Sequence, residues 1–306
     1  MKKRFFTTMK NQHILPCVEE LRTCLLIEGG FVSRPAGRYR PDATAWAIAA
    51  LSIAGTKTEF LQSSRIRLVK DQLSDGRITI SAEQQDVVWP TPIAIIALHG
   101  SDEFDAPKSK AIDFLLNTTG DHWAKKPDQV ADHDTALKGW PWVVGTHSWV
   151  EPTALSIIAL RISGYGMHQR TQEAQQMLLN RQLSKGGWNY GNTRVFGKEL
   201  PPMPETTGIA LAALGGQVPE SSIEKSIFYL ESNIDKMQTP LSLGWSILGL
   251  SAYGQRSHKV NEWVIHCLEN QNKYGVYDTA MLSLMIITFF AENGIVNLFH
   301  SQGKKN

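Results

Sequence analysis

The stretch from Asp132 to Thr153, DHDTALKGWPWVVGTHSWVEPT, is the densest set of residues in the chain that could do chemistry. A carboxylic acid in a water-poor site can donate a proton, and tryptophan π-faces can stabilise a carbocation. The pattern therefore predicts acid-initiated chemistry on an apolar substrate. The structural alternative is an irregular loop packed by its tryptophans, with its acids in water. The candidate acids here are Asp132 and Asp134, and the candidate substrate contacts are His147, Trp140, Trp142 and Trp149.

A second set of acids recurs at one register. Asp42, Glu151 and Glu205 each stand two residues before the threonine of a repeated apolar octapeptide. An acid in the first turn of a helix is stabilised by the helix dipole, so capping is one interpretation. The other is that helix starts surround the mouth of a cavity, where burial raises the pKa of a carboxyl group and makes it a proton donor.

Four more aromatic residues are candidate substrate contacts. Trp188 and Tyr190 open the second long loop, GGWNYGNTRVFGKELPPMPETT, and could equally be packed where the preceding helix ends. Trp46 and Trp245 occupy the third position of the octapeptide, from which they could point into a central cavity or between helices. His133 and His147 have no recognised metal-ligand spacing, so no metal site is predicted.

The elements that must position these residues form a repeat. The pattern Thr, small, apolar, small, apolar, apolar, small, Leu is apolar nearly all round, which is typical of a helix buried on every side. Small residues three apart would let neighbouring helices approach closely. The copies are TAWAIAAL from Thr44, TPIAIIAL from Thr91, TALSIIAL from Thr153, TGIALAAL from Thr207, and weaker forms from Leu243 and Thr279.

Amphipathic helices are expected between these copies, at Phe60–Leu73, Lys108–Leu116, Thr171–Leu183, Ile223–Leu230 and Val260–Leu268. Several end in a motif such as QLSKGGW (Gln182–Trp188), in which Gly adopts the left-handed conformation that stops a helix and the aromatic folds back. LIEGGF (Leu26–Phe31) and NTTGDHW (Asn117–Trp123) are weaker copies. The sequence therefore predicts an all-α fold in which six buried inner helices are ringed by amphipathic outer helices.

Gln-x-x-x-Gly-x-Trp followed by Pro-Thr-Ala-x-Ala-x-x-Ala-Leu resembles the QW repeat of squalene–hopene and oxidosqualene cyclases. The same α/α toroid is found in protein prenyltransferase β subunits. The resemblance covers roughly residues 17–295 and implies an (α/α)6 toroid with an aromatic-lined cavity for an isoprenoid or similar lipid. The expected organisation is an N-terminal tail (1–16), one toroid domain (17–297) and a C-terminal tail (298–306).

The chain departs from both families at their catalytic motifs. The cyclases that the chain resembles have two toroids and carry the motif Asp-x-Asp-Asp-Thr-Ala. The corresponding segment here, RPDATA, keeps the middle acid as Asp42 but has Arg40 and Ala43 in place of the other two acids. DHDTA keeps Asp132 and Asp134 but lies in a loop. Where the prenyltransferases have a zinc-binding Asp-x-Cys, this chain has Asp278 and Ala280, which argues against zinc-dependent prenyl transfer.

Composition excludes several other classes. A net charge of +2 does not indicate nucleic-acid binding. Three cysteines without a C-x-x-C pair favour a reducing compartment. We therefore expect a cytoplasmic protein, with peripheral membrane contact as an option, that needs no cofactor and no obligate partner. The hypotheses are an isoprenoid-handling toroid, including a cyclase (an isomerase or lyase) that protonates an alkene or epoxide; a non-catalytic lipid- or partner-binding toroid; and, third, an (α/α) barrel acting on polysaccharide.

Overall fold

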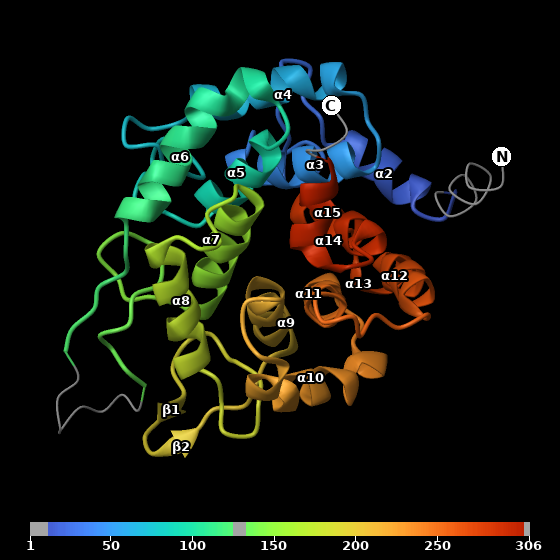
Figure 1. Ribbon diagram of the computed structural model, residues 1–306. Coiled ribbons are helices and arrows are strands. Elements are labelled where there is room, and N and C mark those ends of the chain that lie inside the picture. Colours follow the sequence, from blue (N-terminus) through green and yellow to red (C-terminus); the bar gives the residue numbers. More distant parts are fainter. Residues whose placement is uncertain (1–11, 125–132, 303–306) are drawn as a thin grey trace.

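The computed structural model describes residues 12–124 and 133–302. In this part of the chain, six inner helices form a ring and six outer helices surround it, with the colours running once around from blue to red (Figure 1). The predicted (α/α)6 toroid is confirmed. The inner helices are α3 (Pro41–Ile53), α5 (Pro90–Leu98), α7 (Val150–Ile162), α9 (Pro204–Leu214), α11 (Pro240–Ser251) and α14 (Thr279–Phe290). The outer helices are α2 (Leu15–Arg22), α4 (Thr58–Lys70), α6 (Asp105–Asn117), α8 (Gln169–Asn180), α10 (Glu224–Glu231) and α12 (Val260–Glu269).

Short elements complete the described structure. One-turn 3-10 helices lie at Asp102–Phe104, Glu220–Ser222 and Ile234–Lys236, and the short helix α13 spans Gln271–Tyr274. Strands β1 (Arg194–Val195) and β2 (Lys198–Glu199) form an antiparallel hairpin in which Arg194 pairs with Glu199 and Val195 with Lys198. Phe196 and Gly197 at its tip both have positive φ, which is the geometry of a tight two-residue turn.

The ring is closed, which the sequence alone did not establish. Each inner helix packs on the next, and α14 packs back on α3. The backbone N–H of Thr279 donates to the carbonyl of Ser33 at 2.9 Å, which ties the last inner helix to the start of the chain. A closed ring buries the two faces that an open solenoid would expose at its ends.

A threonine at the start of an inner helix fastens the end of the preceding outer helix. In four repeats its hydroxyl accepts the backbone N–H of the residue that ends the stop motif, at 2.8 to 3.1 Å. This hydrogen bond explains why a threonine recurs at the first position of the octapeptide. The pairs are Thr44 with Phe31, Thr91 with Ile78, Thr153 with Trp140, and Thr207 with Trp188.

These bonds also correct one reading of the sequence. The aromatic that folds back on α6 is Trp140, whose indole N–H donates to the carbonyl of Leu115 at 3.0 Å, and Trp123 is half exposed. Trp140 stands 13 residues before Thr153, as Phe31 does before Thr44, so the extra length of this repeat lies between Asn117 and Trp140. The sequence at Asn117–Trp123 resembles the stop motif, but it precedes the inserted residues, and the aromatic that packs on α6 follows them.

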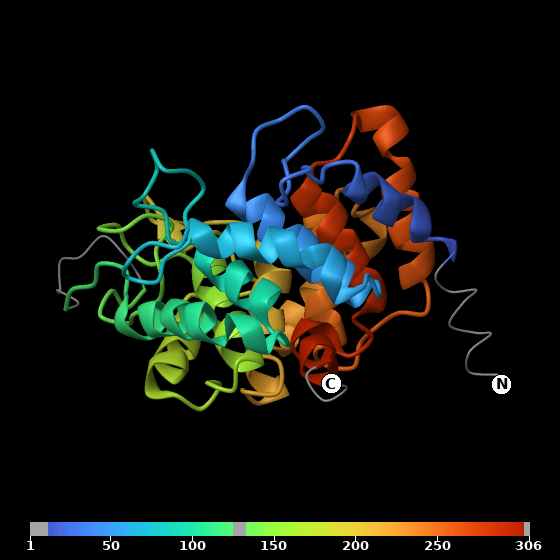
Figure 2. The same cartoon turned by 90° about the horizontal axis from the view of Figure 1, so that it is seen from above.

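All inner helices run in the same direction, so the ring has two unlike ends. Ser242 in the first turn of α11 bonds to Glu205 in the first turn of α9, and Arg161 near the end of α7 bonds to carbonyls at the end of α9. We call the end with the helix starts the long-loop end and the other the short-turn end. Figure 2 shows the blue and teal loops before α3 and α5 on one side and the red C-terminal helix on the opposite side.

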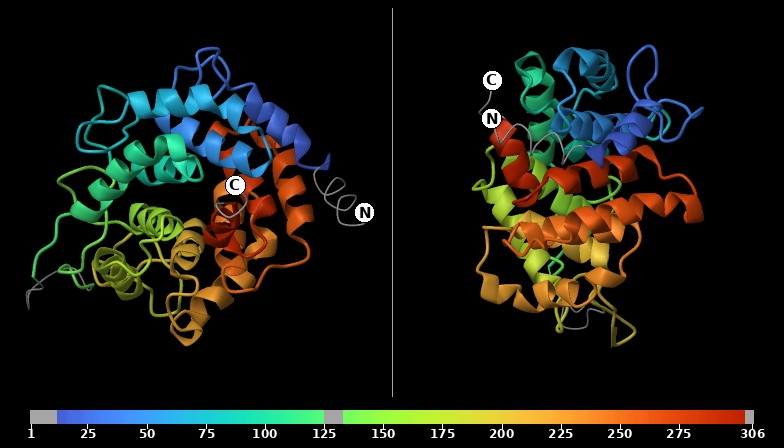
Figure 3. Two further views of the ribbon diagram at one scale, coloured as in Figure 1. Left: turned by 45° about the horizontal axis from the view of Figure 1, so that its top comes forward. Right: turned by 90° about the vertical axis from the view of Figure 1, so that its right-hand side faces the viewer.

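The C-terminal helix α15 (Gly294–Gln302) covers the short-turn end. It packs on α7, α9, α11 and α14, and His300 Nε2 lies 3.0 Å from the carbonyl oxygen of Arg161. The left view of Figure 3 looks along the ring and shows the red C-terminal helix near its centre. This helix continues past residue 297, where the sequence predicted a tail to begin.

Among the described residues, no single helix has the length and apolarity to cross a membrane. Helices α14 and α15 meet that test only when joined, and the chain bends by 79° between them.

Candidate active site at the long-loop end

Two of the predicted acids lie near each other at the long-loop end. Glu151 lies in the first turn of α7 and Glu205 in the first turn of the neighbouring helix α9; both side chains are partly buried. The pKa of Glu151 is raised to about 7, mainly by burial and also by the negative charge of Glu205. Near neutral pH, Glu151 is therefore a carboxylic acid for part of the time, as a proton donor must be.

The two carboxyl groups differ in their hydrogen bonding. The hydroxyl of Ser242, on α11, donates to Glu205 Oε2 at 3.0 Å. Within the described residues, Ser242 bonds to Glu205 and not to Glu151. Ser242 thus holds the carboxylate of Glu205, while burial favours the protonated form of Glu151, which makes Glu151 the better candidate acid.

A tyrosine and a tryptophan lie close to this pair in the structure. The backbone N–H of Val150 donates to the carbonyl of Tyr190 at 3.0 Å, so the second long loop is fastened to the start of α7. The Tyr190 side chain is half exposed, and its pKa is raised by burial and then by the charges of Glu205 and Glu151. Trp149 is the residue just before α7, and its ring stacks on His147 with centroids 4.4 Å apart. Burial, followed by the charge of Arg181, lowers the pKa of His147.

The other predicted acids lie in different surroundings. Both oxygens of Asp42 accept hydrogen bonds from Arg40, at 2.8 and 2.9 Å, so the ion pair occupies the carboxylate. The Asp134 carboxylate accepts the backbone N–H of Ala136, and its own N–H donates to Asn180 at the end of α8. Asp134 thus forms a local turn against an outer helix. Asp132 lies outside the described residues.

The predicted aromatic contacts divide into core and site residues. Trp140 and Trp188 are fully buried, and the Trp188 indole donates to the carbonyl of Leu178 at 2.7 Å. Both rings therefore pack against the ends of outer helices and present no surface to a ligand. Trp46 and Trp245 come from non-adjacent helices, yet their rings meet edge to face at 6.2 Å. They therefore point into the centre of the ring and fill part of it. Trp142 packs on Trp89 in the same way at 6.1 Å.

Sequence reasoning missed three residues at this end of the ring. Trp89 stands two residues before Thr91, the register of Asp42, Glu151 and Glu205, so the repeat itself could have identified it. Ser242 and Tyr229 had no such signal. Tyr229 donates to the carbonyl of Pro202, and its pKa is raised by burial and by Glu205.

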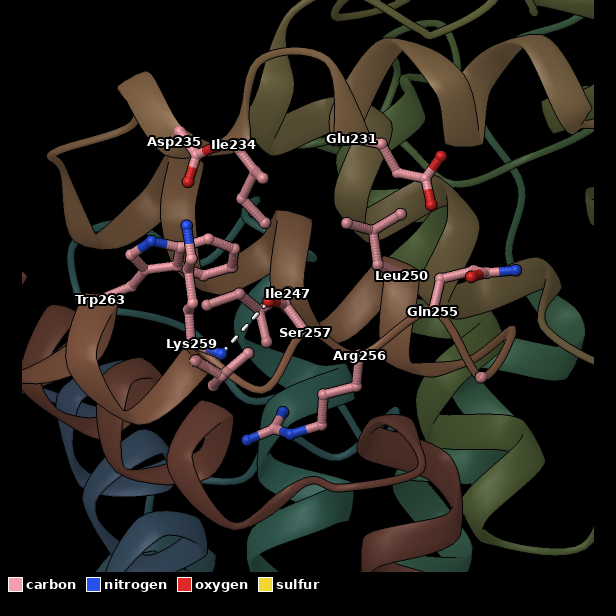
Figure 4. A pocket seen from close by; sticks show the side chains of 12 residues that line it. Glu231, Ile234, Asp235, Ile247, Leu250, Gln255, Arg256, Ser257, Lys259 and Trp263 are labelled. Atoms are coloured by element: carbon pink, nitrogen blue, oxygen red, sulfur yellow. Dashed lines mark hydrogen bonds between the residues drawn. The ribbon is translucent and has the colours of Figure 1, made fainter.

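The cavities described in the structure lie away from this pair of acids. The one shown in Figure 4, of about 380 Å³, lies between α10, α11 and α12 on the outside of the ring, with a floor that includes Ile247, Leu250 and Trp263. In Figure 4, Asp235 and Lys259 lie on one side of it and Glu231 on the other. Among the described residues, no group of three or more His, Cys, Asp or Glu side chains could hold a metal ion.

No family model and no curated protein matches the sequence of this chain. Solved structures share its fold. A variant of the type II terpene cyclase MstE from Scytonema, in complex with its substrate geranylgeranyl dihydroxybenzoate, has a TM-score of 0.59 and 12% identity over 95% of this chain and 99% of that chain. A protein from Actinoplanes has a TM-score of 0.60 and 13% identity over 93% and 99%.

A novel α-amylase from Clostridium perfringens aligns as well, with a TM-score of 0.59 and 11% identity over 92% of this chain and 97% of that one. At these identities the likeness establishes the toroid fold, which unrelated reactions share. Because the chain spans nearly the full length of each of these proteins, a single ring accounts for the similarity.

Proposed function

We propose that this chain is a single-ring terpenoid cyclase in which Glu151 is the acid. The observation that carries the proposal is the pair of acids in the first turns of α7 and α9, where burial and the charge of Glu205 raise the pKa of Glu151 to about 7. The pair lies at the long-loop end of a ring whose inner helices are apolar. The fold it shares with a cyclase solved with a prenylated substrate supports the same conclusion.

The proposed reaction needs no cofactor. Protonated Glu151 gives its proton either to the π electrons of a terminal alkene or to a lone pair on an epoxide oxygen. In the second case the C–O bond breaks, its electron pair goes to the oxygen, and the cation forms on carbon. The next double bond attacks the cation and closes a ring. A proton then leaves the cyclised cation for the Glu151 carboxylate, so the acid is regenerated and the product is an isomer of the substrate.

Residues near Glu151 would stabilise the cation. Glu205, held by Ser242, places a negative charge close to where positive charge develops. The Trp46–Trp245 pair in the centre of the ring offers π-faces without a nucleophile. We propose that the substrate enters at the long-loop end and that the whole reaction takes place within the toroid domain, residues 17–297.

The test is product analysis by chromatography and mass spectrometry after incubating the purified protein with squalene, its epoxide and a prenylated aromatic acid. We expect a cyclised isomer, and a loss of at least about 100-fold in its rate in Glu151→Gln, because general acids contribute that much. The matched control is Asp42→Asn, which removes an ion-paired acid at the same register and should retain most activity. Loss in Asp42→Asn with full activity in Glu151→Gln would overturn the assignment.

One observation favours a second function, hydrolysis of a glycosidic bond. Two neighbouring carboxyl groups, one with a raised pKa, are the arrangement that glycosidases use, and an α-amylase shares the fold. Maltooligosaccharides and aryl glycosides belong in the same assay. Hydrolysis that requires both Glu151 and Glu205, without any cyclised isoprenoid, would replace the cyclase proposal.

A further inference from the structure

Three arginines bind the carbonyl groups that end inner helices at the short-turn end. Arg161 donates to the carbonyls of Ala212, Ala213 and Gly215, and Arg256 to those of Thr288, Phe289 and Ala291. In both residues the two terminal nitrogens are used. Such bonds satisfy backbone groups that a helix end leaves without partners.

The third arginine, Arg65 on α4, is bonded less completely. Its Nε donates to the carbonyl of Ala97 at 3.1 Å and its Nη2 to the hydroxyl of Ser52 at 3.1 Å. Its Nη1 is shielded from solvent and makes no hydrogen bond within the described residues. The side chain is 4% exposed, and none of the ion pairs found in the described part of the chain includes it. A buried cation without a counter-charge is costly.

A cavity of about 180 Å³ adjoins this guanidinium. Besides Arg65, hydroxyl-bearing residues and an imidazole line it: Ser52, Thr56, Thr58 and His99. His99 Nε2 is also shielded from solvent and has no hydrogen-bond partner among the described residues. Phe299 of α15 forms part of the wall, so the helix that covers this end of the ring also encloses the cavity.

The cavity lies at the N-terminus of α4. Thr56 and Thr58 flank Lys57, the residue at the start of this 13-residue helix, and no side chain caps its first backbone N–H groups. The acid of the first turn, Glu59, is turned to the surface, where it pairs with Lys57 at 3.5 Å. Free N–H groups and the positive end of the helix dipole attract an anion.

We propose that this cavity binds a small oxyanion of the phosphate type. The Arg65 guanidinium, the hydroxyls of Ser52, Thr56 and Thr58, and the first N–H groups of α4 are its donors. No carboxylate lines the cavity, so a cation has no ligands there, and the polar walls give an apolar molecule little to contact. Bound, the anion would supply the counter-charge that Arg65 lacks.

The test is titration of the purified protein with inorganic phosphate at constant ionic strength, followed by ³¹P NMR and by thermal unfolding. A second arm uses methyl phosphate, which separates the free ion from a phosphate ester, and a third uses chloride. We expect saturable binding of phosphate or its ester and none of chloride. The matched variants are Arg65→Met, in which binding should weaken at least tenfold, and Arg256→Met, which loses a similar helix-end contact away from the cavity and should bind normally.

Because Arg65→Met also loses two structural bonds, Thr58→Val serves as a second, milder variant and should weaken binding several-fold without unfolding the protein. Three outcomes would overturn the proposal: no saturable phosphate signal, which leaves only water in the cavity; an equal response to chloride; or equal binding by Arg65→Met and the unaltered chain.

Discussion

The two ends of the ring are built from the same helices but carry opposite chemistry. At the long-loop end the inner helices begin, and acids stand in the first turns of α3, α7 and α9. At the short-turn end they finish, and Arg65, Arg161 and Arg256 bind their last carbonyl groups. Because all six inner helices point the same way, the positive dipole ends gather at one end and the negative ends at the other.

Some of these charged residues are explained by helix polarity alone, and others are not. Helix polarity accounts for acids at one end and arginines at the other without any ligand. It accounts for Asp42, whose charge Arg40 balances. It does not account for Glu151, whose pKa is raised to about 7 by burial and then by the charge of Glu205 on the adjacent helix. Two groups therefore stand out against this background. At the long-loop end it is Glu151, whose pKa is raised, and at the other end it is Arg65, whose Nη1 makes no hydrogen bond within the described residues.

The largest expected change in stability is at the short-turn end. Arg161→Met leaves three helix-end carbonyls of α9 without their charged donor, which should lower the free energy of unfolding by roughly 2–4 kcal/mol. Urea unfolding followed by circular dichroism measures this. The cyclase reaction should keep its pH dependence, because Arg161 lies at the opposite end from Glu151. A change below about 0.5 kcal/mol would show that water replaces the guanidinium there.

The next contrast is in the pH dependence of stability. The folded pKa of Glu151, about 7, lies above its ordinary value of 4.5, so the folded state binds more protons between these values. Stability should therefore fall as pH rises from about 4.5 to 7, by about 1–3 kcal/mol once water access to the side chain is considered.

The matched variant isolates this contribution from other titrating groups. Relative to the unaltered chain, Glu151→Gln should gain stability at pH 8 compared with pH 4, as measured by urea unfolding at both values. Glu205→Gln should make the fall in stability smaller, because it removes one cause of the raised pKa. An identical pH profile in all three proteins would contradict an ionisable, buried Glu151.

A smaller loss of stability is expected at Thr153, whose hydroxyl accepts the backbone N–H of Trp140. Thr153→Val leaves the buried N–H of Trp140 without its acceptor and should cost about 1–2 kcal/mol. Thr153→Ser keeps the hydroxyl and should cost much less. Equal losses in the two variants, measured by denaturant unfolding, would assign the effect to packing of the methyl group instead.

The smallest effect is expected at Asp42. Asp42→Asn replaces a charged partner of Arg40 by a neutral amide that can still accept one bond, so we expect a loss of about 0.5–1 kcal/mol. The loss should diminish in high salt, which thermal unfolding at two salt concentrations measures. A loss as large as that of Arg161→Met would show that both ends depend equally on their charged contacts.

The sequence by itself determined the repeat and what each helix does. The octapeptides located all six inner helices to within three residues of their starts, because apolar runs rich in alanine and leucine, which favour helix, are typical of buried helices. The register of Asp42, Glu151 and Glu205 followed directly from that repeat. The stop motifs at Gly186 and Gly76 marked where outer helices end, since positive φ at these glycines is a local requirement.

Only the tertiary structure decided which of these residues meet. The repeat gives Asp42 and Glu151 the same position. The partner of Asp42 is local, because Arg40 stands two residues before it, whereas the nearness of Glu151 to Glu205 depends on how α7 packs on α9. The meeting of Trp46 and Trp245 required a closed ring. A one-dimensional pattern records the spacing within a helix and from one repeat to the next. Contacts across the ring, and the covering of one end by α15, depend on how the ring closes.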